Sequence, residues 1–138
     1  MELEEGLFEE IKNLCIKGDA HFEEDELELA AESYEKALDL LPAPKEKWEA
    51  ALWIYTALGD AYFNLDELEK AEQYLGLALA CPEGDKNPYI QLVMGKTLYE
   101  LGKGEEARDH LLEAYELDGE EVFEDEDPKY LDCIEDLI

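Results

Sequence analysis

Residues 30–42, with the sequence AAESYEKALDLLP, carry two alanines seven residues apart, and the same spacing occurs twice more in the chain. The pairs are Ala30 with Ala37, Ala71 with Ala78, and Ala107 with Ala114. A glycine precedes each pair by 12 residues, at Gly18, Gly59 and Gly95. An aromatic column (Phe22, Phe63, Tyr99) and a bulky column (Tyr34, Leu75, Leu111) keep the same register. This recurrence indicates three copies of one helix pair.

Helix packing gives the physical reason for the small residues. Two antiparallel helices approach to about 8–10 Å only where their contact carries little side-chain bulk. We therefore expect the glycine of each first helix to face an alanine of the second. The second alanine of each pair should allow the next helix pair to stack closely.

The pattern resembles the tetratricopeptide repeat, a helix–turn–helix unit of about 34 residues. Residues 30–42 and the stretch LGDAY at 58–62 are similar to the family consensus. The resemblance covers residues 11–119 and implies an all-α fold: three tetratricopeptide helix-turn-helix repeats stacked as a short right-handed superhelix, with a C-terminal capping helix. The repeats are expected at about 11–44, 45–84 and 87–119, within a single domain of 138 residues.

The apolar periodicity and the turn residues predict where the helices begin and end. The predicted helices are 4–23, 26–40, 45–64, 67–80, 88–101, 105–117 and 128–137. The step from the first repeat to the second is longer than usual, and we expect its extra residues to form two additional turns at the start of the 45–64 helix. Asp66, Asn87 and Asp127 are predicted N-caps, the last two followed by proline at the first helical position. The acidic stretch 118–127 is predicted to be a solvated linker with Phe123 in the core.

The composition favours a cytoplasmic protein. No apolar run approaches the ~18 residues of a membrane span, and the N-terminus is acidic, unlike a secretory signal. The three cysteines, Cys15, Cys81 and Cys133, are far apart and lack a CxxC spacing, so they are expected to be reduced thiols.

The charge is the second prominent feature of the sequence. Asp and Glu number 39 against 11 Lys and Arg, giving a formal net charge of −28. This charge could serve only to keep the protein soluble. It also favours encounter with a basic protein and repels nucleic acid and anionic membranes. We therefore expect a basic protein partner, no nucleic acid and no membrane.

The resemblance to the tetratricopeptide family implies that the first helix of each repeat lines a concave groove. Transferred residue by residue, the groove positions are Lys12, Cys15, Asp19, Phe22 and Glu23 in the first repeat, Trp53, Thr56, Asp60, Phe63 and Asn64 in the second, and Tyr89, Leu92, Lys96, Tyr99 and Glu100 in the third. Aromatic rings alternate with carboxylates there, which suits a surface bearing arginine or lysine. The convex face or the acidic tail is the alternative binding surface, and packing by the terminal helices could cover some of the rings.

Co-chaperones of this family hold acidic C-termini with a basic and amide clamp. The corresponding residues here are Cys15, Asp19, Asp60, Tyr89 and Val93. Two acids in that position would repel a carboxylate, so capture of an acidic tail is not expected.

No pattern in the sequence supports catalysis, a metal or a cofactor. His21 and His110 lie in different repeats, and the spacing of Cys15 and His21 does not place them on one helix face. There is no glycine-rich phosphate loop, and residues 118–127 lack the ligand pattern of a calcium loop. We therefore predict a non-enzymatic protein without catalytic residues.

Two functions remain after these exclusions. The closing stretch 87–131 resembles small bacterial three-repeat proteins found beside polymorphic toxins, which implies an immunity-type inhibitor that sequesters a basic toxin domain such as a nuclease. The alternative is a cytosolic chaperone or scaffold that binds an extended peptide of a partner. The sequence leaves the identity of the partner and the oligomeric state open.

Overall fold

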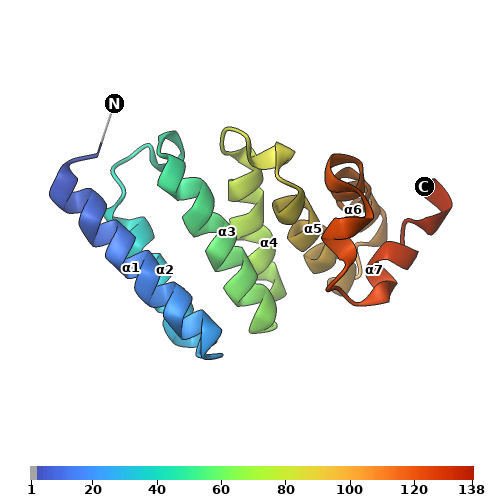
Figure 1. Ribbon diagram of the computed structural model, residues 1–138, viewed down its shortest axis with the longest axis horizontal. Coiled ribbons are helices and arrows are strands. Elements are labelled where there is room, and N and C mark those ends of the chain that lie inside the picture. Colours follow the sequence, from blue (N-terminus) through green and yellow to red (C-terminus); the bar gives the residue numbers. More distant parts are fainter. Residues whose placement is uncertain (1–2) are drawn as a thin grey trace.

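The computed structural model describes residues 3–138 and contains no strand within that range. Its helices are α1 (Glu5–Glu23), α2 (Leu27–Leu40), α3 (Glu49–Asn64), α4 (Leu68–Ala80), α5 (Pro88–Glu100), α6 (Gly104–Asp118) and α7 (Pro128–Asp132), with 3₁₀ turns η1 (Lys45–Lys47), η2 (Gly84–Lys86), η3 (Gly119–Phe123) and η4 (Glu135–Leu137). Consecutive helices pair as α1–α2, α3–α4 and α5–α6, and the three pairs stack side by side (Figure 1). The all-α prediction of three stacked repeats and a C-terminal cap is confirmed.

The small residues do bring the helices together, although the predicted partner of the glycines is wrong. All six alanines of the repeated pairs are fully buried. Each glycine, however, faces the bulky column of the second helix: a methyl group on Gly59 would lie 2.5 Å from Cγ of Leu75. Gly18 and Gly95 stand in the same relation to Tyr34 and Leu111, at 2.6 Å. The glycine is thus the socket for a large side chain, and the alanines lie elsewhere in the interface.

The turn inside each repeat depends on one residue with a left-handed backbone. Asp25, Asp66 and Gly102 occupy this position, with φ of 62°, 63° and 81°. At the middle turn, the N–H of Glu67 donates to the carbonyl of Tyr62 at 2.9 Å, which closes the end of α3. The prediction that Asp66 caps α4 is therefore wrong: this residue ends α3, a role in which aspartate replaces the more usual glycine.

The extra residues of the longer repeat step do not extend a helix as predicted. Pro42 and Pro44 precede the 3₁₀ turn η1, Trp48 is extended (φ −93°, ψ 133°), and α3 begins only at Glu49. Lys45 stabilises the loop, because its Nζ donates to the carbonyl oxygens of Leu38 and Leu41 at 2.7 and 2.8 Å. The added length is therefore a folded loop at one edge of the stack.

The C-terminal segment, residues 119–137, covers the third repeat. Asn87 and Asp127 are N-caps as predicted, each accepting backbone N–H bonds before α5 and α7. Phe123, Tyr130 and Ile134 are at most 5% exposed and pack with core residues of α5 and α6. The last helix is shorter than predicted, because α7 ends at Asp132 and a 3₁₀ turn follows.

Candidate partner-binding groove

A hollow of about 290 Å³ lies between α1 and α3 and contains three of the predicted acidic residues. Its lining residues are Asp19, Phe22, Glu23, Tyr34, Ala57 and Asp60. Asp19 and Glu23 are exposed, and Phe22 is half-buried. The structure therefore brings three carboxylates and an aromatic ring of the predicted set into one concavity.

Tyrosine hydroxyls hold both aspartates of this hollow. The hydroxyl of Tyr34 donates to Oδ1 of Asp19 at 2.6 Å, and the hydroxyl of Tyr89 donates to Oδ2 of Asp60 at 2.6 Å. Burial, together with the neighbouring carboxylate, raises the pKa of each tyrosine well above its usual value. The tyrosines therefore stay protonated as donors, and they orient the carboxylates without neutralising them.

The environment of Asp60 disfavours its charge. Burial raises the pKa of Asp60, and Glu126 raises it further, whereas the bond from Tyr89 and the charge of Lys96 lower it. The net direction is upward. An acid whose folded pKa exceeds its unfolded pKa adds stability only when protonated, so the ionised Asp60 costs stability at neutral pH.

Replacement of Asp60 with asparagine is therefore expected to stabilise the fold at pH 7, by about 1 kcal/mol or less because the group is partly exposed. The amide keeps an acceptor for the Tyr89 hydroxyl. The advantage over the natural protein should shrink as the pH falls towards 4, where Asp60 takes up its proton. Urea unfolding at pH 7 and pH 4 measures both values. Glu24→Gln, which removes one charge at an exposed position, is the control, and an equal gain in both variants would contradict the argument.

The C-terminal segment occupies much of the groove face of α5. Nζ of Lys96 pairs with Oε1 of Glu126 at 2.5 Å and lies 4.9 Å from the centre of the Phe63 ring. The Tyr99 and Tyr130 rings pack in a T-shaped arrangement, with their centres 5.4 Å apart. These two predicted groove residues are therefore already engaged within the chain.

Residues of the C-terminal segment also bind the carboxylate of Glu100. It accepts a hydrogen bond from the hydroxyl of Tyr130 at 2.7 Å and pairs with Lys129 at 2.9 Å. These two donors lower the pKa of Glu100, and the carboxylate is charged at neutral pH.

Other predicted groove residues fall outside the hollow. Leu92 is 1% exposed and packs in the core below the C-terminal segment. The Thr56 hydroxyl donates to the carbonyl of Leu52, and Asn64 donates to the carbonyl of Asp60 at 2.8 Å. Lys12 is exposed on α1. Trp53 is 55% exposed but lines a different hollow, beside the inter-repeat loops.

Sequence reasoning missed three residues that shape the groove. Tyr34 belongs to the bulky column, so the register alone indicated only a packing role. Glu126 and Tyr130 follow the repeats, and the family register assigns no groove position to them. The Asp127-Pro128 cap was a signal for a helix there, although not for its contacts.

Both histidines contact polar side chains of the chain. Nδ1 of His110 lies 2.7 Å from Oε1 of Gln91, and burial lowers the pKa of His110. His21 pairs with Glu26 at 3.0 Å. Within residues 3–138, no group of three or more His, Cys, Asp or Glu side chains is placed to hold a metal ion. None of the helices in this part of the chain has the length and apolar character to cross a membrane.

The chain is similar to a known repeat family. The family model for the tetratricopeptide repeat matches residues 11–44 and 54–80, which lie in the first two helix pairs. The third pair, α5–α6, repeats the same contact between a glycine and a bulky residue. No curated protein sequence matches the chain.

Solved structures share the fold over nearly the full length. The TPR domain of Arabidopsis OM64 aligns with a TM-score of 0.74 at 20% identity, covering 95% of this chain and 96% of that one. The C-terminal TPR-containing domain of a Plasmodium falciparum FK506-binding protein aligns with a TM-score of 0.79 at 19% identity, covering 99% and 93%. The first TPR of Spaghetti (RPAP3), bound to the HSP90 peptide SRMEEVD, aligns with a TM-score of 0.74 at 21% identity, covering 94% of each chain. These structures establish the fold as three helix-turn-helix repeats of the tetratricopeptide type, in a short right-handed superhelix with a C-terminal cap.

Proposed function

We propose that this fold of three tetratricopeptide repeats serves as a non-enzymatic protein-binding module whose groove takes a basic partner. The observation that carries the proposal is the hollow between α1 and α3, where Asp19, Glu23 and Asp60 surround one concavity. An arginine or lysine entering it would meet carboxylates that tyrosines already orient, so little side-chain entropy is lost on binding.

The stability that the ionised Asp60 costs the free protein also favours a basic partner. A partly buried carboxylate whose pKa is raised destabilises the free protein, and a bound cation would relieve that cost. The formal charge of −28 adds a long-range attraction for basic surfaces. Both effects reward a cationic ligand.

The specific form that we propose is an immunity-type inhibitor, which sequesters a basic toxin domain such as a nuclease in the cytoplasm of a bacterium. The groove carboxylates would pair with the basic residues with which a nuclease holds phosphates, and so occlude its active site. Three free cysteines are in keeping with a reducing compartment.

The second candidate is a chaperone or scaffold that holds an extended peptide. The structure of the RPAP3 repeat with an HSP90 peptide favours it, since that related fold binds a peptide. The bound sequence SRMEEVD is acidic, whereas the hollow here presents carboxylates. A peptide ligand for this chain would therefore be basic or apolar.

A triple variant, Asp19→Asn with Glu23→Gln and Asp60→Asn, tests the groove. We expect the variant to bind a basic partner from native lysate with an affinity at least about tenfold lower. Each lost carboxylate leaves a cation of the partner without its ion pair. The matched control, Glu28→Gln with Glu69→Gln and Glu113→Gln, removes the same charge from exposed positions on the second helices. It should bind like the natural protein.

Salt separates the two candidates. Raising the salt from 0.05 to 0.5 M should weaken capture of a basic partner strongly, because the screening length falls below about 10 Å. Capture of an apolar peptide should change little. Failure to recover any basic protein at either salt concentration, including from cells that carry the neighbouring genes, would count against the proposal. So would direct binding of SRMEEVD.

A further inference from the structure

The inter-repeat loops build a second recognition surface that shares no residue with the hollow between α1 and α3. One hollow of about 560 Å³ lies between Trp48 and Trp53 on one side and Pro82 and Pro88 on the other. A neighbouring hollow of about 700 Å³ is lined by Phe8 of α1. Lys47, Trp48 and Glu49 line both hollows, so they form the ridge between them. We call this surface, centred on Phe8, Trp48 and Trp53, the tryptophan edge.

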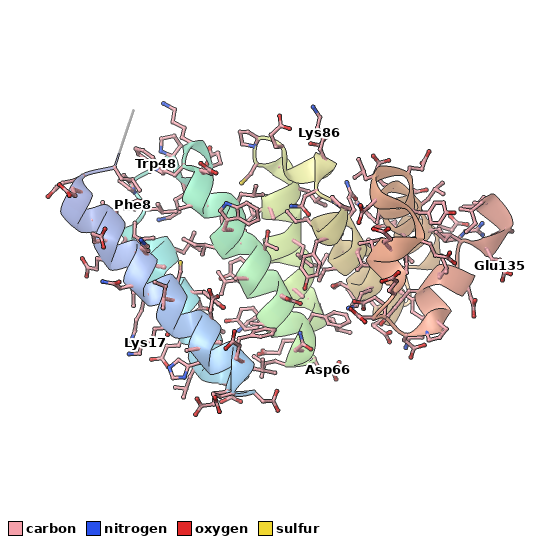
Figure 2. The ribbon with its side chains drawn as sticks, viewed as in Figure 1. Phe8, Lys17, Trp48, Asp66, Lys86 and Glu135 are labelled. Atoms are coloured by element: carbon pink, nitrogen blue, oxygen red, sulfur yellow. The ribbon has the colours of Figure 1, made fainter. Side chains whose placement is uncertain are left out.

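The tryptophan edge lies along one side of the molecule, where the first helices begin. Phe8, Trp48 and Lys86 all project along this edge (Figure 2). Phe8 is 49% exposed and Trp53 is 55% exposed. Nε1 of Trp48 donates to the carbonyl of Pro42 at 2.9 Å, which holds the ridge in place. Contiguous exposed aromatic surface of this kind marks interaction sites in soluble proteins.

Charge decides which partner this surface can take. The lining residues include Glu5, Glu46, Glu49 and Glu83 against Lys47 and Lys86. Nζ of Lys86 is 4.0 Å from Oε2 of Glu83, so these two charges offset each other and three carboxylates remain against Lys47. The rim is therefore acidic around apolar floors. A second copy of this chain would bring another charge of −28 and is electrostatically disfavoured.

We propose that the tryptophan edge docks a basic amphipathic helix of a partner protein, with one apolar side chain in each hollow and lysine or arginine against the rim. Two apolar floors separated by a ridge match the i and i+4 or i+7 anchors of such a helix. The assignment does not depend on the groove, although the same basic partner could engage both surfaces.

The two tryptophans of the chain, Trp48 and Trp53, both lie on this surface, so intrinsic fluorescence reports on it specifically. The probe is a tryptophan-free amphipathic peptide of leucine and lysine, titrated at 0.1 M salt. A peptide with serine in place of leucine has the same charge and is the control. A third peptide of leucine and glutamate tests whether the negative charge of the rim selects a basic helix. We expect a blue shift and at least threefold protection from acrylamide quenching with the leucine–lysine peptide alone.

Matched variants on α1 locate the site. Phe8→Ser should weaken the fluorescence-detected affinity at least fivefold, whereas Ile16→Ser, which is similarly exposed but lies outside both hollows, should leave it unchanged. In this fluorescence titration, the triple groove variant should bind the leucine–lysine peptide as its charge-matched control does. A failure of the groove proposal can therefore be told apart from a failure of this one. An equal response to the serine peptide, an equal response to the glutamate peptide, or equal affinities of the two α1 variants would overturn the assignment.

Discussion

Replacing Gly59 with alanine is expected to lower the free energy of unfolding by about 2–3 kcal/mol. The new methyl group would lie 2.5 Å from Cγ and 2.6 Å from Cδ2 of Leu75, and Leu75 is fully buried. The new methyl group is fixed to the backbone of α3, and the buried Leu75 side chain has no free space to move into. The contact between α3 and α4 must therefore widen. Urea unfolding followed by circular dichroism measures the loss.

Gly76 provides the matched control, because it lies inside α4 and a methyl group added to it would meet no other atom within 4 Å. Alanine there should stabilise the protein by about 0.5–1 kcal/mol, since it removes the entropic cost of a helical glycine. Leu75→Ala alone should cost about 2–5 kcal/mol. In that background Gly59→Ala should cost little, because the clashing atoms are gone. The same change in stability for both glycine replacements would contradict the socket role of Gly59.

Replacing Phe123 with alanine is expected to cost about 3–4 kcal/mol, in the range for large aromatic side chains of a core. Phe123 is 5% exposed and packs with Leu92, Leu111 and Ile134. Its loss should release the C-terminal segment before the repeats unfold. Amide hydrogen exchange should therefore accelerate first in residues 119–137 and in α5, and only weakly in α2 and α3.

Glu124 is the neighbouring control for this variant. It is exposed, and its replacement by alanine should change stability by no more than about 0.5 kcal/mol. If Phe123→Ala leaves exchange in residues 119–137 unaltered, the segment is held by its polar contacts, such as Lys96 with Glu126, rather than by its aromatic anchor.

The repeated small residues predicted the helix pairs, because a residue as small as Ala30 or Gly59 is buried only where another helix packs directly against it. The failures have local causes. Asp66 has the side chain of an N-cap, but its backbone is left-handed and it ends the preceding helix instead. The residues before α3 were predicted to be helical from their apolar spacing, whereas they form a 3₁₀ turn and an extended residue, in a loop that Lys45 ties to the end of α2.

The candidate groove was predictable in its acidic half and not in the other half. Asp19 and Asp60 follow from the register of α1 and α3, which the repeats define. Leu92 and Lys96 obey the same register, yet residues beyond the repeats cover or pair them. A register transferred from a repeat family describes one unit at a time, and it cannot include contacts from a segment that has no counterpart in the unit.

The C-terminal segment also covers one end of the stack of helix pairs. Phe123, Tyr130 and Ile134 fill the face of the third repeat on which the leading helix of another unit would rest. A neighbouring molecule arriving end to end meets a surface that is already sealed, so open-ended fibres cannot form by that route.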